Sequence, residues 1–86
     1  MSIRNDIITR LTAEFTPTLL EVIDESNYHR GHATNPGGGE THFKVIIASP
    51  LFRDRSLVEQ HRMVYAALRE PLSRGVHALA LDTRVE

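Results

Sequence analysis

Five histidines are the residues of this 86-residue sequence best suited to chemistry. Imidazole binds transition metals as a neutral ligand and changes charge near neutral pH. His29 and His32 lie in a stretch rich in glycine and asparagine, where side chains can reach a ligand. His42 and His77 each open a predicted strand, whereas His61 lies among apolar residues at helical spacing and is expected to pack. From residue type alone, the four histidines other than His61 are either metal ligands or side chains that are solvated or hydrogen-bonded.

Other catalytic chemistries find little support in the sequence. The chain has no cysteine, which excludes disulfides, a thiol nucleophile, a CxxC redox pair and a zinc ribbon. It has no HExxH or GxSxG motif, and the run 37–39 of glycines has no P-loop lysine. Asp24 and Glu25 are adjacent at the end of a predicted strand and point to opposite faces, which is poor geometry for acid–base work. We expect the protein not to be an enzyme.

The charges nearly balance, since 10 Lys and Arg against 11 Asp and Glu give a formal net charge of -1. This balance disfavours a tight nucleic-acid binder that works alone, because phosphate affinity grows with the number of cationic contacts. A local basic patch near the predicted second helix is one option, formed by Arg53, Arg55, Arg62 and Lys44. The other option is a solvated charged face that is balanced by neighbouring acids.

Length and composition indicate one small globular domain over residues 1–86, with 41% hydrophobic and 24% charged residues. No apolar run approaches the roughly 20 residues of a membrane span. Residues 1–6 lack the basic start and apolar block of a secretory signal. We therefore expect a cytoplasmic protein without membrane contact.

Hydrophobic periodicity predicts the first three elements. Apolar residues four apart predict a helix over 3–15, with Ser2 as its N-cap. Strands are predicted over 19–26 and 42–49. The segment 27–39 between them has the composition of a long loop.

A capping box at Ser56 predicts a second helix over 56–70. Its apolar stripe is expected to begin at Leu57. Pro71 is expected to kink or restart this helix, because an interior proline loses a hydrogen bond and clashes with the preceding turn. A short extra helix at 71–74 would then follow.

The last strand is predicted over 76–81, after a helical crossover of residues 50–75 that suits a parallel connection. Parallel neighbours start at one edge of a sheet, so the loop 27–39 and His77 are expected at the same end of the molecule. The predicted fold class is α/β (α+β), in the order α-β-β-α-(α)-β, with a three-stranded mixed sheet and helices on one face. This order resembles a K-homology domain, although the nucleotide-clamping GxxG is absent.

Motifs along the chain resemble those of the BolA-like family. They are Asp24-Glu25-Ser26, the E-T-H-F run within Gly39 to Val45, the segment 56–65, and the V-H-A-L-A run within Gly75 to Leu81. The resemblance covers nearly the whole chain, from about residue 3 to residue 83. It implies a KH-like fold without the GxxG clamp.

The resemblance implies two lines of function. In one, the protein pairs with a monothiol glutaredoxin and helps to ligate a bridging [2Fe-2S] cluster, in iron–sulfur trafficking or in iron and redox sensing. His77 and either His29 or His32 would be its ligands, while the glutaredoxin supplies its cysteine and glutathione. In the other, the protein is a DNA-binding transcriptional regulator of stress response and cell morphology, with a helix-turn-helix-like surface in residues 52–72. Alone, it is expected to be a monomer or a weak homodimer.

The lack of cysteine agrees with the first of these lines. A [2Fe-2S] cluster held by protein needs thiolates, or two histidines and two cysteines. A chain with histidines alone can complete a cluster and cannot hold one, so the thiolates must come from a partner.

Overall fold

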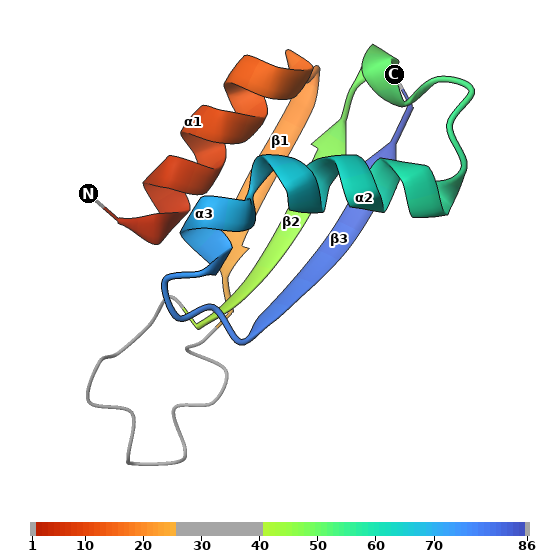
Figure 1. Cartoon of the computed structure of the whole chain (residues 1–86). Coiled ribbons are helices and arrows are strands. Elements are labelled where there is room, and N and C mark those ends of the chain that lie inside the picture. Colours follow the sequence, from red (N-terminus) through yellow and green to blue (C-terminus); the bar gives the residue numbers. More distant parts are fainter. Residues whose placement is uncertain (1, 26–40, 86) are drawn as a thin grey trace.

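The computed structural model describes residues 2–25 and 41–85. Three helices cover one face of a three-stranded sheet whose strand order is β1-β2-β3 (Figure 1). β1 and β2 are antiparallel, whereas β2 and β3 are parallel. The predicted α+β class, the element order and the mixed sheet are therefore confirmed.

The first helix, α1 (Ile3–Phe15), follows the prediction at both ends. The Ser2 hydroxyl accepts a hydrogen bond from the Asn5 backbone N–H at 3.0 Å, as an N-cap does. The helix ends at Thr16, whose φ of 41° is left-handed. Its buried side chains recur every four residues, which fits one apolar face against the sheet; they are Ile7, Leu11 and Phe15.

The two antiparallel strands are β1 (Leu19–Asp24) and β2 (His42–Ala48). Alternation along β2 buries Phe43, Val45 and Ile47 against the helices. Each strand ends slightly before its predicted end. Ser49, just after β2, is still extended and donates its N–H to the Arg84 carbonyl at 3.0 Å, and the 3-10 turn that begins at Pro50 ends the strand there.

The connector after β2 contributes to the core, which the sequence did not predict. Pro50–Phe52 forms a short 3-10 helix, η2, and the Phe52 side chain is fully buried. Its ring centroid lies 5.2 Å from that of Phe15. The buried Ser49 hydroxyl donates to the Phe15 carbonyl at 2.7 Å and accepts from the Leu51 N–H at 3.1 Å. This segment therefore fastens the end of β2 to the end of α1.

The second helix, α2 (Leu57–Ala67), begins with the predicted capping box between Ser56 and Glu59. It ends earlier than the predicted residue 70, and a short helix, α3 (Arg69–Leu72), follows it. Pro71 explains the break, because it has no N–H for the carbonyl of Ala67 four residues earlier. The extra helix thus contains Pro71 and does not start there.

The buried stripe of α2 also differs from the prediction. Leu57 is 61% exposed, so the stripe does not begin there. The buried residues of α2 are Gln60 and Val64. The side-chain amide of Gln60 is hydrogen-bonded at both ends. Its Nε2 donates to the Arg55 carbonyl at 2.9 Å, and its Oε1 accepts from the Thr83 hydroxyl at 2.6 Å. A polar side chain therefore joins α2 to the last strand.

The last strand, β3 (Ala78–Arg84), starts two residues later and ends three residues later than the predicted 76–81. Register explains the shift, since β3 pairs with every residue of β2, from His42 opposite Ala78 to Ala48 opposite Arg84. β3 is an edge strand among the described elements and is only half buried.

Candidate functional site

The candidate site lies at the end of the sheet where β2 and β3 both begin. The Thr41 carbonyl accepts hydrogen bonds from the backbone N–H groups of His77 at 2.7 Å and Ala78 at 3.2 Å. Gly75 makes the preceding turn with a φ of 105°, a backbone conformation that side-chain-bearing residues rarely adopt. The backbone of His77 is therefore fixed beside the start of β2, while its side chain is exposed.

Glu25 and Thr41, the described residues on either side of residues 26–40, lie at this same end. Glu25, just after β1, donates its N–H to the His42 carbonyl at 2.7 Å. The end of β1 and the starts of β2 and β3 lie together in Figure 1. The predicted ligands His29 and His32 belong to that segment and lie outside the described residues. Of the two described residues that flank this segment, Thr41 bonds to the His77 backbone and Glu25 to the His42 carbonyl, and the proximity of the loop histidines to His77 stays a prediction.

His42 is a neighbour of His77 that the sequence reading did not select as a ligand. The centroids of the two imidazole rings lie 6.2 Å apart, with an interplanar angle of 42°. The Thr41 hydroxyl and Nδ1 of His42 form a hydrogen bond of 2.9 Å. The signal that could have identified the pair is topological, because parallel strands bring their first residues together.

His61 takes no part in this site. It is half buried on α2, in agreement with the expectation that it packs. Its Nε2 is buried and has no hydrogen-bond partner among the described residues. The structure therefore leaves His61 as a packing residue.

Three of the four candidate basic residues lie on α2 or in the turn before it. Arg53 and Arg55 are exposed in the turn before α2, and Arg62 is exposed on α2. The hydrogen bond from the Ser56 backbone N–H, the Ser56 hydroxyl and the charges of Arg55 and Arg62 lower the pKa of Glu59 below its ordinary value of 4.5. An acid thus offsets part of this patch, as the alternative of a balanced face expected.

Lys44 lies apart from the three arginines. It alternates with Phe43 and Val45, which pack against the helices, so its side chain lies on the opposite face of the sheet. There its charge helps to lower the pKa of Asp82, after the larger effect of the Arg84 hydrogen bond. The structure therefore separates Lys44 from the patch at α2.

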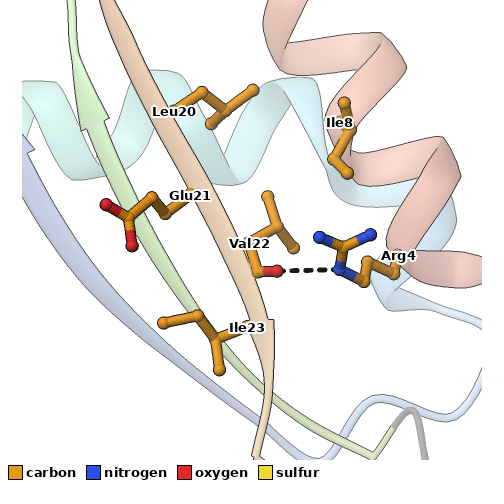
Figure 2. Close-up of a pocket in the computed structure, with 6 residues that line it drawn as sticks. All are labelled: Arg4, Ile8, Leu20, Glu21, Val22 and Ile23. Atoms are coloured by element: carbon orange, nitrogen blue, oxygen red, sulfur yellow. Dashed lines mark hydrogen bonds between the residues drawn. The ribbon is translucent and has the colours of Figure 1, made fainter.

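A shallow hollow of about 260 Å³ lies between α1 and β1, and none of its lining residues is a histidine (Figure 2). Nε of Arg4 donates there to the Val22 carbonyl at 2.8 Å. The other lining residues are Ile8, Leu20, Glu21 and Ile23. The hollow offers no candidate metal ligand of imidazole type.

Residues 2–25 and 41–85 contain neither a metal-binding cluster nor a membrane-spanning helix. No group of three or more histidine, aspartate or glutamate side chains there is placed to hold a metal ion. No helix in that part of the chain is long and apolar enough to cross a membrane.

The fold and this end of the sheet define a class: small α+β proteins with a mixed three-stranded sheet and a histidine at the start of its parallel strand. Comparison with known families narrows the class, because the family described as "BolA-like protein" matches residues 11–86. The chain belongs to the BolA-like family.

Relatives support this membership in sequence and in structure. The chain is 47% identical over 83 residues to the "DNA-binding transcriptional regulator BolA" of Escherichia coli (strain K12), covering 96% of this chain and 75% of that protein. It is 45% identical over 78 residues to "BolA-like protein 1" of Bos taurus, covering 91% of this chain and 55% of that protein. The solved "BolA domain of SufE1 from Arabidopsis thaliana" superposes with a TM-score of 0.85 at 39% identity, covering 99% of this chain and 93% of that one. The chain thus spans about half the length of the bovine relative.

Proposed function

We propose that this BolA-like protein is a non-catalytic partner of a monothiol glutaredoxin, working in the cytoplasm. The two proteins would share a bridging [2Fe-2S] cluster in iron–sulfur trafficking or in iron and redox sensing. His77 would be one ligand and His29 or His32 the other. The partner would supply its cysteine and its glutathione.

One observation carries the proposal: His77 is exposed while its backbone is held against Thr41. A ligand on a fixed backbone loses little conformational freedom when it binds a metal. Residues 25 and 41, where the segment with the other two histidines is attached, lie at the same end of the sheet.

The donor set of this chain suits a shared cluster. Imidazoles can replace two thiolates on one iron of a [2Fe-2S] cluster, and the remaining ligands must be thiolates. This chain has no cysteine to offer. The cluster, once bound, would supply electron-transfer and iron-donor chemistry, and this chain would supply orientation and two nitrogen ligands.

The test is to mix the protein with a cluster-loaded monothiol glutaredoxin and record visible circular dichroism. We expect a new spectrum with the wild type and none with His77→Ala, whose far-ultraviolet spectrum should stay native because the side chain is exposed. The double variant His29→Ala/His32→Ala should also lose the new spectrum. An unchanged mixed spectrum with His77→Ala would contradict the proposal.

DNA binding is the second candidate. It is supported by the name of the Escherichia coli relative and by the exposed arginines 53, 55 and 62 around the start of α2. These residues lie in the helix-turn-helix-like region 52–72 that the sequence reading proposed. Of the two α-helices in this region, α2 has 11 residues and α3 has four. Among the described residues, α2 is therefore the helix that would enter a DNA groove.

Salt dependence tests this second candidate. Each phosphate contact contributes about -0.9 to the slope of log affinity against log salt concentration. Arg53→Ala and Arg62→Ala should each make the slope shallower by about that amount if the residue contacts a phosphate. Lys44→Ala is the matched control, because its side chain lies on the other face of the sheet and should leave the slope unchanged. Equal effects of all three variants would exclude α2 as the docking surface.

A further inference from the structure

We propose that two copies of this chain dimerise by pairing their β3 strands antiparallel, which would join the two sheets into one continuous sheet. This inference goes beyond the proposed function and involves neither a metal nor a glutaredoxin. It rests on three features: the unpaired outer edge of β3, the apolar first turn of α2 beyond that edge, and the order of residues along β3.

The outer edge of β3 carries backbone groups that no described strand pairs. β2 lies on one side of β3, and none of the described strands lies on the other. Ala78 and Arg84, at the two ends of β3, make their backbone hydrogen bonds on the β2 side. Because bonding direction alternates along a strand, Leu79, Leu81 and Thr83 direct their N–H and C=O groups outward. Such an edge is a template for another strand.

The contact between this edge and a helix side chain is weak. The Tyr65 hydroxyl donates to the Leu79 carbonyl at 3.4 Å, which is long for a hydrogen bond. A carbonyl oxygen has two lone pairs, so it can also accept from an added strand. At the outer edge of β1, by contrast, the guanidinium of Arg4 donates to the Val22 carbonyl at 2.8 Å. β3 is therefore the sheet edge that is easier to pair.

The first turn of α2 extends beyond the β3 edge. Gln60 already lies over β3, since its Oε1 accepts from the Thr83 hydroxyl at 2.6 Å. Leu57 is one turn earlier, and the start of α2 lies past β3 in Figure 1. Leu57 shares a helix face with the fully buried Val64, seven residues later, yet it is 61% exposed because no described strand lies beneath it. A strand added to β3 would cover it.

The residue order of β3 fits a second copy as the added strand. With the two-fold axis beside Leu81, each Leu79 is opposite Thr83 of the other copy, and all seven residues of the strand overlap. Each outward residue pair then exchanges two backbone hydrogen bonds. An axis beside Asp82 would instead place the two Asp82 carboxylates directly opposite each other, which is unfavourable. The axis beside Leu81 is therefore the one we propose.

Charges on the uncovered face of the sheet are complementary in this arrangement. Asp82 is opposite Ala80 of the second copy, and Ala80 is the register partner of Lys44 on β2. The small alanine side chain between them lets the Lys44 ammonium approach the Asp82 carboxylate of the other copy. A second copy is therefore an occupant that the charges of this face fit.

The exposed apolar side chains meet on the face that carries the helices. Thr83 bonds to Gln60 and is opposite Leu79 of the second copy, so Leu57 would contact that Leu79 and the Tyr65 beside it. Leu57 and Tyr65 are 61% and 45% exposed in one copy. Thr83 and Leu79 are four residues apart, about 13 Å along a strand. The two α2 helices therefore have room to lie side by side at the usual distance of about 8–10 Å.

The test is small-angle X-ray scattering and amide hydrogen exchange at rising protein concentration, up to about 1 mM. We expect a reversible equilibrium between monomer and dimer. The N–H groups of Leu79, Leu81 and Thr83 should become protected from exchange as the dimer forms. The Ala80 N–H, which is on the β2 side, should be protected at every concentration.

Leu57→Asp should raise the dissociation constant of the dimer by more than about tenfold, because it places a carboxylate in the apolar contact. The variant should fold, since Leu57 is exposed and an acidic residue suits the first turn of a helix. Leu51→Asp is the matched control, because Leu51 is 48% exposed but lines a hollow between α1 and α2. It should leave the dissociation constant unchanged, and far-ultraviolet circular dichroism checks that both variants are folded.

Three results would overturn the inference. The first is a wild type that stays monomeric at about 1 mM. The second is a dimer in which the three outward N–H groups of β3 remain unprotected. The third is an equal effect of Leu57→Asp and Leu51→Asp on the dissociation constant. None of these experiments contains a glutaredoxin or a cluster, so their outcome is independent of the proposed function.

Discussion

Ser49→Ala tests how η2 fastens the sheet to α1. Ser49 is fully buried, and its hydroxyl makes two hydrogen bonds, to the Phe15 carbonyl at 2.7 Å and from the Leu51 N–H at 3.1 Å. Each bond contributes about 0.5–1.5 kcal/mol net, and a buried group left without a partner costs about 1–3 kcal/mol.

Each of the two partner groups can keep a hydrogen bond when the Ser49 hydroxyl is removed. The Phe15 carbonyl also accepts from the Thr16 hydroxyl at 2.8 Å. Leu51 is 48% exposed, so water can reach its N–H. We therefore expect Ser49→Ala to lower the free energy of unfolding by about 1–2 kcal/mol, near the sum of the two net bond contributions.

Urea unfolding measures this change. With a slope m of about 1–2 kcal/mol/M, the midpoint should fall by roughly 1 M while m stays constant. Ser73→Ala is the matched control, because its exposed hydroxyl bonds only the Glu70 carbonyl at 2.6 Å and such sites change stability by less than about 0.5 kcal/mol. If Ser49→Ala is no more destabilising than Ser73→Ala, the buried hydroxyl does not fasten the two elements.

Two more predictions concern other contacts of the fold. Gln60→Ala should destabilise the protein by about 1–3 kcal/mol in urea unfolding, because it removes two hydrogen bonds of a buried side chain, to the Thr83 hydroxyl and the Arg55 carbonyl, each worth about 0.5–1.5 kcal/mol. An effect below about 0.5 kcal/mol would contradict this. The pKa of Glu59 is lowered in the folded state, so its contribution is present above its ordinary value of 4.5 and disappears as the pH falls through the folded value. The stability difference between wild type and Glu59→Gln should therefore shrink on acidification, and a constant difference from pH 7 to about 3 would be inconsistent with it.

The parts of the fold that depend on local patterns were predictable. α1 needs only a capping serine and apolar residues four apart, and both lie within one stretch of sequence. The parallel pairing of β2 and β3 followed from the length of the connection between them.

The parts that depend on tertiary contacts were not. Phe52 was predicted as a connector residue and Ser49 as the last residue of a strand, and both are buried because α1 ends beside them. The first and last residues of β3 are determined by its pairing with β2, and its own apolar run, 76–81, did not indicate them. For the same reason the neighbour relation of His42 and His77, which are 35 positions apart in the numbering, was hidden until the strands were aligned. The choice between His29 and His32 remains a prediction.

Arg4 has a consequence for the behaviour of the protein at high concentration. An edge strand offers unpaired backbone groups to any other extended chain, which is a route to aggregation. The guanidinium of Arg4 already holds the Val22 carbonyl on β1, so an incoming strand must first break a hydrogen bond to a charged donor, which is worth about 1.5–3 kcal/mol. The first turn of α1 thereby hinders fibril-like growth along β1.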